Sequence, residues 1–147
     1  MGEKINYGRV ILGGVVAGIV AEILGIVVDG VLLAPQWAAG MKALGRAEFS
    51  AGQDVAFGVM EVVLGVFMIW LYAAIRPRYG AGPKTAVCAG VAIWFAGVLL
   101  PNIGFMWVGG LFPPGLTVMT SAGGIVELVA GALAGAALYK ESEPLSH

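Results

Sequence analysis

Residues 123–135 read GGIVELVAGALAG, an apolar, glycine-rich stretch with a single carboxylate, Glu127, at its centre. The stretch belongs to a longer run without Lys or Arg, about residues 116–139. Because about 20 apolar residues suffice for a helix to cross a bilayer core, this run predicts a transmembrane helix. An acid that faces lipid inside such a helix is costly, so we expect Glu127 to face protein or trapped water.

Three more runs of this kind precede it, at about residues 10–34, 55–75 and 85–103. The chain has 147 residues, of which 59% are hydrophobic and 12% charged, which is too apolar for a soluble domain of this size. We therefore predict an all-α membrane protein, a bundle of four transmembrane helices with antiparallel neighbours. The whole chain, 1–147, forms this single membrane domain, and its surroundings are the lipid bilayer.

The connections between the spans differ in character. Segment 36–48 contains Trp37, Met41 and Leu44 at the spacing of a short amphipathic helix, which favours an interfacial helix over an ordinary packed loop. Residues 75–84, IRPRYGAGPK, hold two prolines and two glycines and predict a turn. The uncharged 104–115 connection is expected to lie in the interface or against the bundle.

The basic residues are unevenly divided between the two sides of the membrane. Six lie on the side of the termini, against two on the other side: Lys4, Arg9, Arg76, Arg78, Lys84 and Lys140, against Lys42 and Arg46. By the positive-inside rule, both termini are expected to be cytoplasmic. The first span is longer than a signal-peptide core, so we expect it to be retained.

Polar residues within the spans are the candidates for ligand or proton binding. They are Glu22, Asp29, Asp54, Glu61, Asn102 and Glu127. The intramembrane acids share their helix faces with glycines, which mark the faces where helices approach closely. Counting the rise per residue places Asp29 with Glu61 in a shallow tier, and Glu22 with Glu127 in a deeper tier near mid-membrane. This pattern predicts a common acidic cavity, open to the outer side and closed inward.

Two readings of these acids remain open. Carboxyl groups buried together are expected to be protonated or to share protons at neutral pH, and so could exchange a proton for a cation or a small cationic ligand. Such a site would suit ligand binding or transport, with transport requiring a homo-oligomer or a larger complex. Alternatively, Glu22, Glu61 and Glu127 only brace the helices through hydrogen bonds, in a structural or accessory subunit of a membrane complex.

Other functional classes have less support. No Ser-His arrangement, nucleophilic cysteine or clustered Asp motif is present, so the sequence leans away from an enzyme and indicates no catalytic residues. The only histidine is His147, and the only cysteine, Cys88, lies within an apolar span, so no metal site or bound cofactor is expected. Nothing in the sequence suggests binding to nucleic acid.

A weak internal repeat pairs residues 58–72 with 124–139, each with a glutamate followed four residues later by glycine and each ending in Leu-Tyr. A tandem duplication of helical hairpins would explain it, as would the shared vocabulary of membrane helices. The segments Pro35-Gln36-Trp37 and Met41-Lys42-Ala43-Leu44-Gly45 resemble those of small, uncharacterised four-helix bacterial membrane proteins, a family of unknown function. The resemblance implies the bacterial inner membrane and brings no activity with it.

Overall fold

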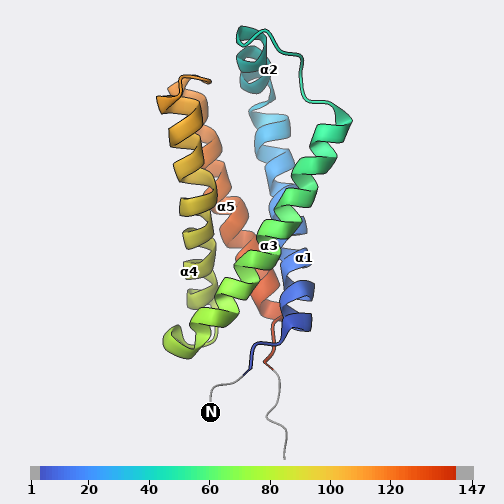
Figure 1. Ribbon diagram of the computed structural model, residues 1–147, viewed down its shortest axis with the longest axis vertical. Helices are drawn as coiled ribbons and strands as arrows, with labels where there is room; N and C mark the ends of the chain where they lie inside the picture. Colours follow the sequence, from blue (N-terminus) through green and yellow to red (C-terminus); the bar gives the residue numbers. More distant parts are fainter. Residues whose placement is uncertain (1–3, 142–147) are drawn as a thin grey trace, which may run out of the picture.

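The computed structural model describes residues 4–141 as an assembly of helices (Figure 1). His147 therefore lies outside the described residues. In chain order the elements are α1 (Tyr7–Gly25), η1 (Ile26–Leu32), α2 (Ala34–Ala43), α3 (Ala51–Tyr79), α4 (Pro83–Trp94), η2 (Phe95–Leu99), η3 (Asn102–Val108) and α5 (Pro114–Leu138). Elements η1, η2 and η3 are π-helical segments, which have wider turns than an α-helix.

Four helical segments are long and apolar enough to cross a membrane: Tyr7–Leu32, Ala51–Tyr79, Pro83–Val108 and Pro114–Leu138. The first joins α1 to η1, and the third joins α4 to η2 and η3. The prediction of an all-α bundle of four spanning helices is thus confirmed, and the chain is a multi-pass membrane protein.

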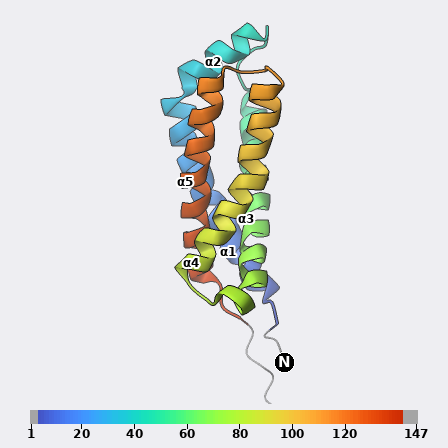
Figure 2. The ribbon, with the colours of Figure 1, turned by 90° about the vertical axis from the view of Figure 1, so that its left-hand side faces the viewer.

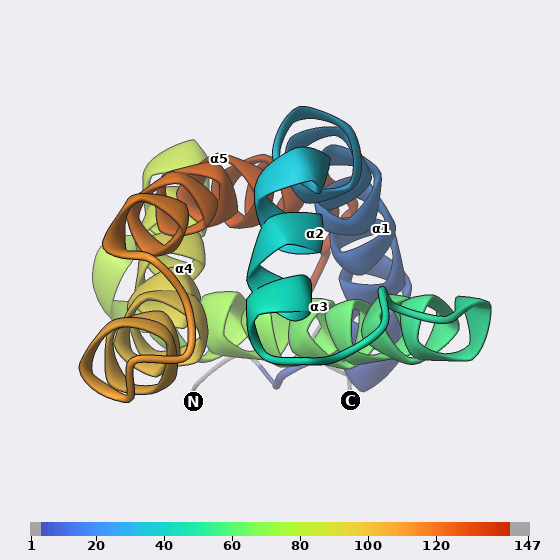
Figure 3. The ribbon, with the colours of Figure 1, turned by 90° about the horizontal axis from the view of Figure 1, so that it is seen from above.

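The short helix α2 lies across one end of the bundle (Figures 2 and 3). We call this end the α2 end, and the opposite end, where the first and last described residues lie, the terminal end (Figure 1).

Two helices extend further than the sequence indicated. Helix α3 continues through Pro77 to Tyr79, so the turn predicted from residue 75 is shorter than expected. A proline removes one backbone donor, and it is Gly80 and Gly82, with φ angles of +82° and +130°, that form the turn. The third span likewise continues to Val108, beyond the expected end at 103, because its residues stay apolar until the glycines that follow.

Glycines allow the closest helix contacts. Helix α1 packs against α3 and α5, while α4 packs against α5 and α3 (Figure 3). A Cβ atom on Gly18 would lie 2.6 Å from the carbonyl oxygen of Glu61, and one on Gly131 would lie 2.6 Å from that of Ala17. Backbone atoms cannot yield as a side chain can, so the prediction that the glycine stripes mark interhelical faces is confirmed.

The packed core fills the terminal half of the bundle. The most deeply buried large side chains there are Met68 and Ile69 of α3, which pack with residues of α1, α4 and α5. Toward the α2 end, α3 inclines away from α4 (Figure 1), and a separate small cluster forms around Leu33, Met106 and Leu116. The bundle is therefore filled at its terminal end and less closely packed at its α2 end.

Candidate functional site

A cavity of about 710 Å³ lies in the less closely packed half. Its walls come from α1, η1, α2, the loop before α3, α3 itself and α5. At the α2 end it reaches Glu48 and Asp54, both of which are exposed. The cavity therefore opens at the α2 end and ends against the packed core.

The cavity collects nearly all the acids of the described chain. Of the nine acidic residues in the sequence, seven fall within residues 4–141. Six of these line the cavity: Glu22, Asp29, Glu48, Asp54, Glu61 and Glu127. None of the Lys or Arg residues, all of which are described, is among the lining residues. The cavity thus has a strong excess of acidic groups with no basic group to balance it.

Asp29 is held in place by two donors. Both Trp37 Nε1, at 2.9 Å, and Thr120 Oγ1, at 2.6 Å, donate to its Oδ1 atom. Because Asp29 lies on the π-helical segment η1, Trp37 on α2 and Thr120 on α5, these bonds join three elements at the mouth of the cavity. The carboxylate is therefore fixed by the fold.

Glu22 and Glu61 lie together deeper in the cavity, on α1 and α3. The Oε1 atom of Glu22 lies 3.6 Å from the position that a Cβ atom on Gly58 would occupy, so Glu22 reaches toward α3 across that glycine. A Cβ atom on Gly18, one turn before Glu22 on α1, would meet the carbonyl oxygen of Glu61, so Glu22 and Glu61 lie on facing stretches of α1 and α3. This arrangement differs from the expected tiers, in which Glu61 was grouped with Asp29.

Glu127 approaches the same region from α5. Its Oε2 atom lies 3.6 Å from the Cβ position of Gly25 on α1. The tiers fail because counting the rise per residue assumes upright helices, whereas α3 is inclined and η1 has wider turns (Figure 1).

Two carboxyl oxygens in the cavity are buried and have no hydrogen-bond partner among the described residues. They are Oε2 of Glu61 and Oε1 of Glu127. Buried polar atoms in proteins are almost always hydrogen-bonded, so such atoms call for an explanation, for example a bound proton, water or ligand.

Asn102, the remaining candidate, is not part of the cavity. Its Nδ2 atom donates to Oγ of Ser121 at 3.1 Å, and Trp94 Nε1 donates to the carbonyl oxygen of the same serine at 2.7 Å. These bonds join the third span to α5 on another face of the bundle. The structure thus gives Asn102 a role in packing.

Sequence reasoning missed several residues of the site. Glu48 lies in a polar loop whose sequence carries no periodic signal, and Thr120 is a single hydroxyl residue within an apolar span. Trp37 was assigned to the membrane interface, yet it lines the cavity together with Phe49 and Phe57. An aromatic residue within reach of an intramembrane acid was the signal that could have found Trp37.

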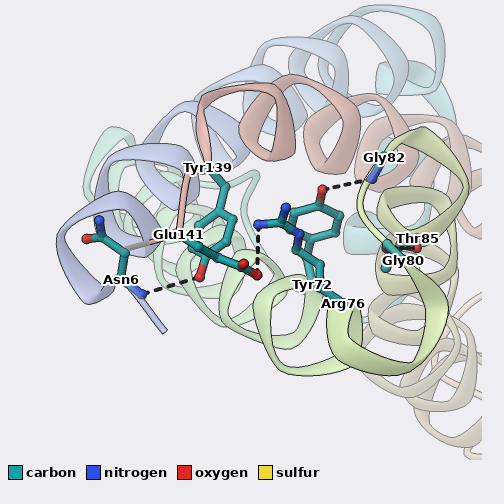
Figure 4. A network of polar contacts seen from close by, with 8 residues as sticks. All are labelled: Asn6, Tyr72, Arg76, Gly80, Gly82, Thr85, Tyr139 and Glu141. Carbon is teal, nitrogen blue, oxygen red and sulfur yellow. Dashed lines mark hydrogen bonds and ion pairs between the residues drawn. The ribbon is translucent and has the colours of Figure 1, made fainter. Parts of the chain in front are cut away.

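The terminal end is closed by a cluster around Arg76, shown in Figure 4. Its guanidinium carbon lies 5.7 Å from the ring centre of Tyr72 and 5.2 Å from that of Tyr139. Arg76 Nη1 also lies 3.0 Å from Glu141 Oε1, a charge contact whose angles are not those of a hydrogen bond.

The two tyrosine hydroxyls extend this cluster to other elements. The hydroxyl of Tyr139 accepts a hydrogen bond from the backbone of Asn6, and that of Tyr72 accepts one from the backbone of Gly82 (Figure 4). The cluster around Arg76 therefore ties together parts of all four spans at the terminal end.

Within residues 4–141, no group of three or more His, Cys, Asp or Glu side chains is arranged to hold a metal ion. No protein-family model matches the chain, and neither the curated proteins nor the solved structures include a match.

Proposed function

We propose that the protein binds a small cation in the acidic cavity and exchanges it for protons. One observation carries this proposal: six acids and no basic residue line the same cavity. Like charges held together out of bulk water repel one another, and either protons or a bound cation relieve that repulsion. The carboxyl groups are thus suited to a competition between the two.

The bracing alternative has less support. Bracing requires hydrogen bonds between helices, yet Glu61 Oε2 and Glu127 Oε1 are buried without a partner among the described residues. Asp29, by contrast, accepts hydrogen bonds from two other elements. We therefore assign a bracing role to Asp29 and a binding role to the deeper glutamates.

The proposed location is the inner membrane of a bacterium, with both termini in the cytoplasm. The excess of Lys and Arg at the terminal end supports this orientation by the positive-inside rule. The cavity, at the opposite end, would then open to the outer side.

Transport requires a further step, because the packed core and the cluster around Arg76 fill the terminal half. Four short spans seldom enclose a complete pathway alone. We propose binding as the activity of the single chain, and transport as an activity of an assembly with further copies or with a membrane partner.

Proton release tests the binding proposal. Purified protein in weakly buffered detergent is titrated with Na⁺, Mg²⁺, spermidine and tetraphenylphosphonium while a pH indicator records released protons. The titrations are repeated between about pH 5 and 9, which covers ordinary and perturbed carboxyl groups. We expect at least one cation to release protons saturably.

The controls compare the loss of acids inside the cavity with the loss of an acid outside it. Replacing Glu22, Glu61 and Glu127 together by Gln should abolish the release, whereas Glu141→Gln, which removes the described acid outside the cavity, should preserve it. The proposal fails if no cation releases protons from the folded protein, or if the triple variant releases them as the wild type does.

A further inference from the structure

We infer that the cation is organic, with one positive centre and an apolar, aromatic body. This inference rests on the proposed function and names the class of ligand that the same cavity takes. It depends on what lines the cavity besides the acids, and on how the acids are spaced.

Three aromatic residues line the cavity near its mouth. Trp37 of α2, Phe49 of the following loop and Phe57 of α3 all line it. The Trp37 and Phe49 rings meet edge to face at 6.2 Å, and Phe49 and Phe57 do so at 5.4 Å. Ring faces attract cations and also pack well against other rings, so this border suits a cation with an aromatic body.

The spacing of the acids disfavours a metal ion. Hard cations such as Mg²⁺ and Ca²⁺ need several oxygen ligands at once. Yet no three of the described acidic side chains are arranged to hold a metal, although six line the cavity. The described carboxyl groups therefore do not offer the converging set of oxygen ligands that such a metal ion needs.

The size and composition of the cavity also favour an organic cation. Its volume of about 710 Å³ falls within the roughly 300–1,000 Å³ typical of sites for drug-sized molecules. Apart from the acids, the wall consists mainly of apolar side chains such as Ile26, Met41 and Met60. The body of an aromatic monocation would cover these apolar side chains.

The unpartnered carboxyl oxygens indicate where the positive centre of the ligand would bind. Glu61 Oε2 and Glu127 Oε1 are buried on the walls of the cavity, well inside the aromatic mouth. A positive centre near them would supply the partner that they lack. The apolar body would then extend toward Trp37 and Phe57, at the α2 end.

Binding of tetraphenylphosphonium to the full chain in detergent, measured by calorimetry, tests the inference. Tetramethylammonium, Na⁺ and spermidine serve as comparison cations. We expect tetraphenylphosphonium to bind most tightly, and Phe57→Ala to weaken its binding about two- to tenfold, the size of a lost contact between aromatic rings. Phe67→Ala is the matched control, because Phe67 lies on the same helix, stacked on Trp70 and outside the cavity.

The outcomes separate this inference from the proposed function. If the small cations bind as tightly as tetraphenylphosphonium, or if Phe57→Ala and Phe67→Ala bind it equally well, the inference is wrong although the cavity still binds cations. If none of the cations binds to the folded protein, the proposed function fails as well.

Discussion

Asp29 shows how a single side chain can shape the cavity. Its Oδ1 atom accepts hydrogen bonds from Trp37 and Thr120, so one carboxylate joins η1, α2 and α5. Asp29 is half-buried, and a hydrogen bond to a partly buried carboxyl group contributes to the stability of a protein. Specific hydrogen bonds therefore join three elements beside the cavity.

We expect Thr120→Val to lower the free energy of unfolding by about 1–3 kcal/mol, because it removes a donor to the Asp29 carboxylate without changing the size of the side chain. Thermal unfolding in detergent measures the effect. Thr117→Val is the matched control: Thr117 is also buried, but its hydroxyl donates over 3.4 Å to Pro113, one turn earlier in the chain. Equal losses in the two variants would contradict the role given to Asp29.

Individual glycines also determine how closely the helices approach one another. We expect Gly131→Ala to destabilise the protein by about 1–3 kcal/mol, because its new Cβ atom would meet the carbonyl oxygen of Ala17. Gly115→Ala, on the same helix, has nothing within 4 Å of its new Cβ atom and should be tolerated. Unfolding curves of the two variants decide the point, and a Gly131→Ala protein as stable as the wild type would refute it.

The sequence alone predicts the direction of the acidic side chains, because an ionisable residue in an apolar transmembrane helix can avoid lipid only by facing protein or water. The cost of facing lipid directs Glu22, Glu61 and Glu127 inward whatever the details of packing. Glu48 and Thr120 carry no such constraint, since a loop tolerates polar residues in any direction and a threonine hydroxyl in a helix can bond to the backbone of the preceding turn. Their part in the site follows only from the tertiary structure.

At the scale of the elements, the inclination of α3 produces the cavity. Its terminal half packs in the core, whereas its other half leans away from α4 (Figure 1). The four spans could be predicted from apolar length alone. Their inclination and the π-helical segments could not, because both depend on contacts between helices rather than on local pattern. This is why the predicted depth of Glu61 was misleading.

The side chain of Arg76 stabilises the terminal end of the bundle. We expect Arg76→Met to lower the free energy of unfolding by about 1–2 kcal/mol, because it removes the cation–aromatic contacts with Tyr72 and Tyr139 and the charge contact with Glu141. Arg78→Met, an exposed position on the same helix, is the control. Equal thermal stabilities of the two variants would show that the cluster contributes little.

For the whole molecule, the orientation in the membrane decides which compartment the cavity faces. Cysteines are introduced singly at Lys42 and at Arg78, which are exposed at opposite ends of the bundle, after Cys88→Ser removes the native thiol. In intact bacterial cells, a membrane-impermeant reagent should label position 42 and leave position 78 unmodified. Labelling of position 78 alone would reverse the orientation and place the cavity mouth in the cytoplasm.

We propose that protons and a cation compete for the carboxyl groups of one cavity. The groups that face it are Glu22 and Asp29 from the first span, Glu48 from the loop, Asp54 and Glu61 from α3, and Glu127 from α5. A carboxyl group attracts a cation only when it is deprotonated, so binding must weaken as the pH falls.

The most direct measurement is the Kd of tetraphenylphosphonium for the wild type as a function of pH, beside the same series for the triple Gln variant of Glu22, Glu61 and Glu127. We expect the wild-type Kd to rise as the pH is lowered from about 9 to 5, because a carboxyl group that has taken up a proton no longer attracts the cation. The triple variant should bind weakly at every pH. A wild-type Kd that does not change with pH, or a triple variant that binds as tightly as the wild type, would contradict the proposal.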